Sequence, residues 1–249
     1  MMQNNQNHLP REDHWIPLAD LMTGLMVIFM LIAISFMIKV KQEALKAEQA
    51  AAQAEQEAVK VKKIALIYNE VKLALYRDLY QEFSPDLPLW GAELKKDLTL
   101  RFKEPEVLFD TGQAMLKPKF TTILNDFFPR YIGILGSDKY RDYIEEIRIE
   151  GHTSSVWNQD TVDYKAYFLN MALSQSRTRS VLSYVFLLPE VQNQRLWLKK
   201  HLTANGLSSS KLIYHRDGTE NKRVSQRVEF KVKLNADDRI AEILNMVQS

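Results

Sequence analysis

Residues 16–38 read IPLADLMTGLMVIFMLIAISFMI, and this apolar run decides how the rest of the chain is organised. Asp20 is the only charged residue in the run. At the rise of an α-helix the run is about 34 Å long, enough to cross a bilayer core of about 30 Å. A signal peptide would have a basic start, a shorter apolar core and an A-x-A cleavage site, which are absent. The sequence therefore predicts an uncleaved transmembrane helix over residues 16–38, preceded by a polar tail, residues 1–15.

The remaining composition excludes several classes of protein. The chain has 249 residues, and its 33 Lys and Arg nearly balance its 31 Asp and Glu, so the charge balance gives no support for nucleic-acid binding. It contains no Cys, which excludes disulfide scaffolds, zinc–thiolate sites and cysteine nucleophiles. Ser154, His152 and Asp160 could be written as a triad, but no G-x-S-x-G motif accompanies them. His152 has no metal-ligand partners at a suitable spacing. We expect neither an enzyme, nor a metal site, nor a cofactor.

Residues 39–84 are predicted to form a helical spacer. They are rich in Ala, Glu, Gln, Lys and Leu and contain no Gly or Pro. Apolar residues recur there at 3-4-3-4 spacing, a pattern typical of the seam of a parallel homodimeric coiled coil: Val61, Ile64, Tyr68, Val71 and Leu75. A solvated single helix that acts only as a spacer is the alternative. Ser84, Pro85, Pro88 and Gly91 then end the helix.

Residues 85–249 are expected to form one compact α/β domain. Alternating patterns predict strands over residues 98–102, 144–150 and 227–234, and residues 107–109 suggest a short additional one. Helices are predicted from Pro118 onward, over residues 164–188, and over residues 191–205 with Gly206 as the C-cap. This order indicates an α/β sandwich with helices on one face of the sheet. The chain as a whole is expected to be of the α+β class.

Four segments of this domain resemble OmpA-like peptidoglycan-binding domains. Residues 109–118 (FDTGQAMLKP) are similar to the F-x-x-x-x-A-x-L-x-P opening of that family. Residues 147–153 (IRIEGHT) are similar to its strand ending in E-G-H-T-D. Residues 170–181 (NMALSQSRTRSV) and 225–230 (SQRVEF) are similar to its N-x-x-L-S-x-x-R helix and its closing N-R-R-V-E strand. The four matches occur in the family's order over about 120 residues, so the combination is specific.

The resemblance implies a pocket for the diaminopimelate-containing peptide of peptidoglycan. Arg177 matches the family's arginine, and a guanidinium suits a peptide carboxylate because it offers charge-assisted, often bidentate, hydrogen bonds. Asn170 would orient the peptide and Leu173 would support the pocket. The remaining residues that the resemblance assigns to it are His152, Thr153 and Arg227. Two departures stand out, because Ser154 replaces the family's Asp and Gln226 replaces an Arg.

The apolar run resembles a second family. Residues 15–26 (WIPLADLMTGLM) are similar to the Asp-bearing span of MotB-type stators, which read approximately A-D-F-M-T-A-M-M. They are more similar to the B subunits of Zorya anti-phage defence systems, the ZorB family. A short tail, one span, a helical spacer and an OmpA-like domain fit that family over nearly the whole chain.

The resemblance implies an ion-driven motor. Members of these families pair two B subunits inside a ring of five multi-span A subunits, and Asp20 would carry the ion, a proton rather than Na⁺. Thr23 and Gly24 share one helical face with Asp20 and would border the ion path. Three alternatives remain open. Asp20 could be a solvated carboxylate that the helix dipole stabilises near the N-terminus of the span. The chain as a whole could be a flagellar stator subunit or a passive wall anchor.

The same resemblance implies a place in the cell. A peptidoglycan-binding domain belongs in the periplasm, so the chain would be a single-pass protein of the bacterial inner membrane with a cytoplasmic N-terminus. A literal count of positive charges disagrees, because Lys39, Lys41 and Lys46 follow the span. We expect the periplasmic orientation in spite of this count, because the domain resembles peptidoglycan-binding domains. The expected partners are therefore peptidoglycan, membrane lipid, the A subunit and a second copy of the chain, without nucleic acid.

Overall fold

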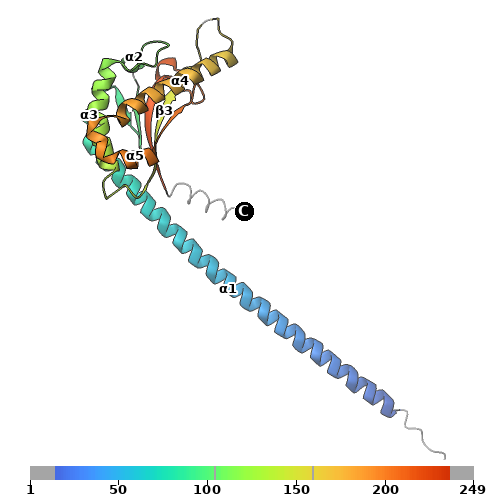
Figure 1. The fold of residues 1–249 in the computed structure, drawn as a ribbon. Helices are drawn as coiled ribbons and strands as arrows, with labels where there is room; N and C mark the ends of the chain where they lie inside the picture. The colour runs from blue at the N-terminus through green and yellow to red at the C-terminus, as the bar shows by residue number, and fades with distance from the viewer. Residues whose placement is uncertain (1–14, 104, 159, 236–249) are drawn as a thin grey trace, which may run out of the picture. The chain divides into compact units, whose positions relative to one another are not determined.

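The computed structural model describes residues 15–103, 105–158 and 160–235, and it divides the chain into two units, Met1–Lys60 and Val61–Ser249. One continuous helix, α1 (Trp15–Phe83), supplies the described part of the first unit (Figure 1). Residues 18–38 of α1 are all exposed, and their length and mean hydropathy are those of a membrane-crossing helix. Except for Trp15, the expected N-terminal tail lies outside the described residues.

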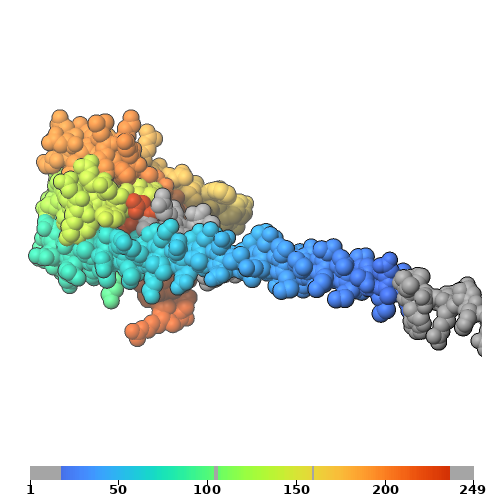
Figure 2. Space-filling model, turned by 90° about the horizontal axis from the view of Figure 1, so that it is seen from below, coloured from blue at the N-terminus to red at the C-terminus, as the bar shows by residue number. Residues whose placement is uncertain are grey.

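The last turns of α1 belong to the core of the second unit. Leu75, Leu79 and Phe83 are fully buried there. The ring of Phe83 lies 5.4 Å from that of Phe127, and Arg130 Nε donates a hydrogen bond of 2.7 Å to Glu82 Oε1. Figure 2 shows this end of α1 directly beside the helix that carries both partners. A domain that begins at residue 85 would lack part of its own core, so the expected boundary is too late.

The burial of Leu75 also changes the expected dimer seam. Tyr68 and Val71 pack against the same core, so this face of α1 is directed at its own domain. The 3-4-3-4 pattern therefore marks intramolecular packing at Leu75, and the prediction of an intermolecular seam there is wrong. On the other side of α1, Leu66, Leu73 and Tyr80 are exposed and recur at intervals of seven residues.

A five-stranded sheet forms the centre of the domain, with the strand order β1-β2-β5-β3-β4. In sheet order the strands are β1 (Ala92–Leu94), β2 (Thr99–Phe102), β5 (Arg227–Leu234), β3 (Ile144–His152) and β4 (Leu202–Gly206). β3 and β4 are parallel, and every other neighbouring pair is antiparallel. The helical elements are α2 (Pro105–Leu108), α3 (Pro118–Leu135), α4 (Asp163–Phe186), the 3₁₀ helix η1 (Pro189–Gln194), α5 (Arg195–His201) and α6 (Lys222–Ser225).

The helices α3 and α4 cover one face of this sheet (Figure 1). Phe127 of α3 packs its ring 5.1 Å from that of Phe230 on β5. A Cβ on Gly151 of β3 would lie 2.6 Å from the Thr178 side chain of α4, so glycine permits the close approach of this strand and helix. Alternate residues of β3 and β5 point to the opposite face, which carries charged side chains. The expected α/β sandwich with helices on one face is confirmed.

Two local expectations are wrong. Residues 107–109 are not a strand, because α2 continues to Leu108 and Phe109 makes only an isolated bridge with Leu116. The helix expected over residues 191–205 ends at His201, and β4 follows it. Gly206 is therefore no helix C-cap. It ends β4, where an added Cβ would lie 2.2 Å from the backbone nitrogen of Gln175 in α4.

Candidate functional site

A pocket of about 460 Å³ opens where β3 ends, beside the middle of α4. The loop after β3, the loop before α3, α4 and α6 all contribute to its wall. Its lining residues are Thr111, Gly112, Thr153, Ser154, Val156, Trp157, Asn170, Leu173, Arg177, Lys222 and Gln226. Four of the residues expected from the sequence thus meet in one pocket: Thr153, Asn170, Leu173 and Arg177.

Arg177 is the best-fixed cation of this pocket. Only 8% of the residue is exposed. Its Nε donates a 2.8 Å hydrogen bond to the carbonyl of Gln113, and its Nη2 donates a 3.2 Å bond to the carbonyl of Asp110. The guanidinium also lies 4.8 Å from the centre of the Phe109 ring, a cation–π contact. These contacts hold the guanidinium in one orientation at the pocket wall.

The partners of Arg177 leave its positive charge without a counterion. Within residues 15–103, 105–158 and 160–235, no carboxylate lies within ion-pair distance of Arg177, and the nearby carboxylate of Asp110 binds Lys117 at 2.9 Å instead. Burial lowers the pKa of the Arg177 guanidinium to about 10, so it stays protonated at neutral pH. A buried cation that is bonded only to neutral carbonyls attracts an anion, because an anionic ligand would compensate its charge.

Asn170 holds the rim of the pocket. It is buried, and its Nδ2 donates to the carbonyl of Ser154 at 3.1 Å and to that of Val156 at 3.4 Å. Glu220 fixes the same loop, because its Oε1 accepts a 3.0 Å hydrogen bond from the backbone nitrogen of Ser155. The donor group of Asn170 is therefore engaged within the protein, and its Oδ1 is the atom with capacity for a ligand.

Lys222 is a pocket residue that the sequence did not reveal. It lies in the single turn α6, whose N-cap Asn221 accepts a 3.2 Å hydrogen bond from the Val224 nitrogen. A lysine in a polar loop has no distinctive pattern, so only the fold brings it to the same pocket as Arg177. Ser154 and Gln226, which differ from the OmpA-like pattern, also line the pocket. Two cations therefore face the pocket, and the carboxylate expected after G-H-T is replaced by a neutral side chain.

His152 and Arg227 lie outside the lining of this pocket. They belong to a buried charged cluster at the ends of β3 and β5, where their Cα positions are paired across the two strands. Arg227 Nε donates a 2.7 Å hydrogen bond to Glu229 Oε1. A small cavity touches both residues and also Arg177, so the cluster borders the pocket from within. Asp160, considered from the sequence as a triad partner of Ser154 and His152, is exposed in the loop before α4.

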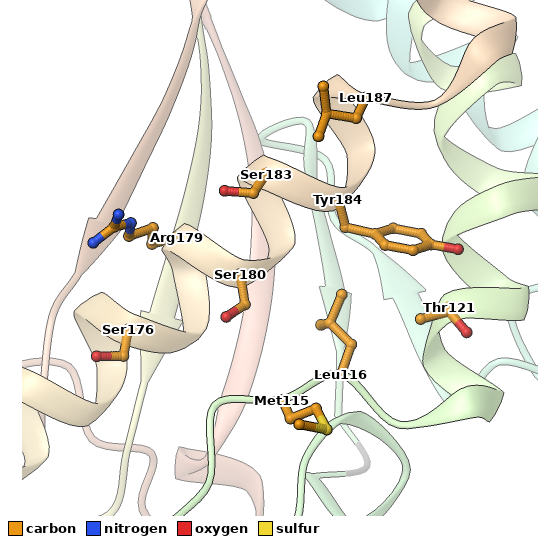
Figure 3. A pocket seen from close by; sticks show the side chains of 9 residues that line it. All are labelled: Met115, Leu116, Thr121, Ser176, Arg179, Ser180, Ser183, Tyr184 and Leu187. Carbon is orange, nitrogen blue, oxygen red and sulfur yellow. The ribbon is translucent and has the colours of Figure 1, made fainter.

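A second hollow, of about 710 Å³, lies between α3 and α4 (Figure 3). It is lined by Met115, Leu116, Thr121, Ser176, Arg179, Ser180, Ser183, Tyr184 and Leu187. Arg179 belongs to this lining, but it is exposed, and Figure 3 shows its guanidinium directed away from Leu116 and Tyr184, whereas Arg177 of the smaller pocket is buried and fixed by two carbonyls. The smaller pocket is therefore the better candidate for an anionic ligand.

The candidate ion-carrying residue lies in α1, in the other unit. Asp20, Thr23 and Gly24 are exposed on one face of this helix, at positions i, i+3 and i+4. Thr23 Oγ1 donates a 2.7 Å hydrogen bond to the carbonyl of Ala19, so its hydroxyl is satisfied within the helix. A Cβ on Gly24 would meet no atom within 4 Å, so the glycine leaves this face open for the approach of another helix.

Comparisons with known proteins identify the family. No protein-family model matches the chain. It is 44% identical over 241 residues to the Zorya protein ZorB of Escherichia coli, a match that covers 95% of this chain and 96% of that protein. Among solved structures, a MotB-like protein from Desulfovibrio vulgaris is 25% identical, with coverage of 67% and 96% and a TM-score of 0.46. The type VI secretion cell wall anchor of Pseudomonas aeruginosa is 17% identical, with coverage of 63% and 97% and a TM-score of 0.39.

The first of these matches agrees with the family expected from the sequence. The Escherichia coli protein is a member of the family that the apolar run resembles. The identity extends over both the apolar helix and the sheet domain, since it covers 95% of the chain. The chain belongs to the ZorB family of Zorya proteins.

Proposed function

We propose that this chain is the B subunit of an ion-driven stator of the bacterial inner membrane, anchored to peptidoglycan and acting in anti-phage defence with a multi-span A subunit. The observation that carries the proposal is a lone carboxylate, Asp20, in an otherwise uncharged apolar stretch of α1. A charged residue at a bilayer centre costs roughly 2.5–3.5 kcal/mol on insertion scales, and such residues commonly mark ion paths.

The ion step uses the two charge states of Asp20. A proton that enters from the periplasm neutralises the carboxylate, and its release toward the cytoplasm restores the negative charge. Each charge moved through 100 mV provides about 2.3 kcal/mol. Neutralisation changes how the helix face of Asp20, Thr23 and Gly24 fits against the A subunits, and this change advances the ring. The small Gly24 favours close helix contact on that face.

The anchor uses the pocket at the end of β3. The Arg177 guanidinium has no counterion among the described residues and supplies the charge-assisted hydrogen bonds that a stem-peptide carboxylate requires. Lys222 adds a second positive charge at the same pocket, and Leu173 offers apolar contact to the peptide. Thr153 and the Asn170 Oδ1 provide polar contacts. Anchoring prevents the B subunits from rotating, so that the A subunits turn around them.

The same proposal describes how the complex is assembled. Two copies of the chain stand within a ring of five A subunits, with their N-termini in the cytoplasm and their sheet domains in the periplasm. The exposed residues Leu66, Leu73 and Tyr80 lie at heptad spacing on the face of α1 that the domain does not cover. We assign the contact between the two copies to this face in place of the one that contains Leu75.

A plating assay tests the proposal. Cells that carry this chain with its A subunit and the accompanying defence genes are infected with phage, and Asp20→Asn is compared with Asp20→Glu. Asn keeps the size and polarity of Asp but cannot take up a proton, so we expect protection to be lost with normal protein levels. Glu restores a titratable carboxylate and should retain part of the protection. Full protection by Asp20→Asn would refute the ion step and favour the passive anchor.

A further inference from the structure

Two glutamates face each other inside the charged side of the sheet. Glu150 of β3 and Glu229 of β5 are directly paired across the antiparallel strands, and they are only 6% and 5% exposed. Like charges at such a pair are destabilising, and burial increases the cost. Two buried carboxylates at paired positions therefore need positive charge close to them.

The positive side chains around the pair engage only one oxygen of each carboxylate. Glu229 Oε1 accepts hydrogen bonds from Arg101 Nε at 2.6 Å and from Arg227 Nε at 2.7 Å. Glu150 Oε1 faces Arg148 Nη1 at 3.5 Å. These contacts orient the carboxylates and leave the Oε2 atom of each one toward a common partner, His152.

His152 is directed into this pair without a hydrogen bond. It is 3% exposed, and neither ring nitrogen has a hydrogen-bond partner among the described residues. Its Nε2 lies 3.5 Å from Glu150 Oε2 and 3.6 Å from Glu229 Oε2. Charge-assisted N–H···O bonds are usually about 2.7–2.9 Å long, so these separations are too long for strong direct bonds. They indicate room for an atom between the three groups.

The separations match a metal ion of a particular geometry. A tetrahedral zinc ion with bonds of about 2.1 Å holds neighbouring ligand atoms about 3.4 Å apart, whereas an octahedral magnesium ion holds them about 2.9 Å apart. Hard cations such as calcium prefer oxygen ligands throughout, and an imidazole does not suit them. We propose that Glu150, His152 and Glu229 form a binding site for a divalent transition-metal ion, best suited to Zn²⁺, with the fourth position open to a solvent molecule.

The site would join the ends of β3 and β5. His152 and Arg227 are paired at that end of the ladder, and the small cavity there also touches Arg177. A metal ion would thus stabilise the strand end that leads into the loop of the pocket. The sequence did not predict this, because Glu229 lies far along the chain and only the register of β3 and β5 brings it beside Glu150.

Metal titration of the full-length chain in detergent tests the proposal. After chelator treatment, Co²⁺ is added as a spectroscopic probe, and the thermal midpoint is measured with and without Zn²⁺. We expect the intense visible absorption of tetrahedral cobalt, its loss on addition of Zn²⁺, and a higher midpoint with Zn²⁺. Glu150→Gln and His152→Asn should weaken Zn²⁺ binding by at least about tenfold. His215→Gln, which removes an exposed histidine, is the matched control and should bind as the wild type does.

Two results would overturn the proposal. The first is a wild-type chain that shows no cobalt absorption and no Zn²⁺-dependent midpoint, which would mean that the three side chains hold no metal. The second is Zn²⁺ binding that survives both Glu150→Gln and His152→Asn, which would place the metal elsewhere. The cobalt spectrum of the wild type needs no variant, so the test stands even if a substitution prevents folding.

Discussion

Replacing Arg177 by alanine tests the pocket through the one cation that the fold has fixed there. The guanidinium is held by the carbonyls of Gln113 and Asp110, and it has no carboxylate partner among the described residues. A hydrogen bond to a charged group contributes about 1.5–3 kcal/mol, which corresponds to a factor of about 10–150 in the dissociation constant. Arg177→Ala should therefore weaken binding to peptidoglycan by about that factor.

Cosedimentation with purified sacculi measures this loss. The full-length chain in detergent is titrated with sacculi, and the bound fraction is compared for the wild type, Arg177→Ala and Arg179→Ala. Arg179 lies two residues further along α4, is exposed and does not line the pocket, so its replacement controls for the loss of a positive charge. Arg177→Lys is the second comparison. A lysine keeps the charge but lacks the fork that lets Arg177 bond two carbonyls and a ligand, so we expect intermediate binding.

Folding has to be separated from binding in this experiment. Arg177→Ala also removes two hydrogen bonds to the segment before α3 and the contact with the Phe109 ring, so a lower thermal midpoint is expected. Binding is therefore compared at a temperature where each variant is folded by circular dichroism. If Arg177→Ala sediments like the wild type under those conditions, the pocket assignment is refuted.

Three further predictions follow from the packing of α1 and from the charged cluster. A fragment of residues 61–249 should fold, whereas residues 85–249 should not, because the shorter piece lacks Leu75, Leu79 and Phe83, each worth about 2–5 kcal/mol; circular dichroism distinguishes the two. Cysteines at Leu66 and Leu73 should crosslink two copies in membranes, whereas a cysteine at the buried Leu75 should not. Crosslinking through Leu75 would instead support the dimer seam that was expected from the sequence. Burial raises the pKa of Glu229, but the nearby His152 and the hydrogen-bonded Arg227 lower it by more, so the net pKa lies below its ordinary 4.5. Its contribution to stability is thus present above pH 4.5 and lost as pH falls, and Glu229→Gln measured in chelator should flatten the acid dependence of the thermal midpoint.

The sequence predicted the strands and helices that have a clear period. Residues 144–150 and 227–234 alternate along a half-buried sheet, and both patterns correspond to strands in the structure. β4 escaped detection because its five residues, LTANG, follow a helix directly and have no distinctive alternation. Its parallel pairing with β3 is a tertiary contact, and such contacts override local propensity.

Periodicity could not say what a helix face packs against. Leu75 lies in a pattern that a coiled-coil seam and a domain core share, and the structure assigns it to the core. The same limit applies to the pocket. Motif matches predicted that Asn170, Leu173 and Arg177 belong to the pocket. Lys222 lies in no motif, and it reaches the pocket only because of the path of the chain before β5. Sequence similarity also grouped His152 with the pocket, whereas its side chain lies in the cluster behind it.

Proton flux through the assembled complex tests the central proposal most directly. The chain is co-purified with its A subunit and reconstituted into liposomes that enclose a pH-sensitive dye, and a membrane potential is applied with valinomycin. The proposal predicts proton uptake with the wild type, partial uptake with Asp20→Glu and none above the protein-free level with Asp20→Asn. Equal uptake by the wild type and Asp20→Asn, in complexes of equal composition, would contradict it.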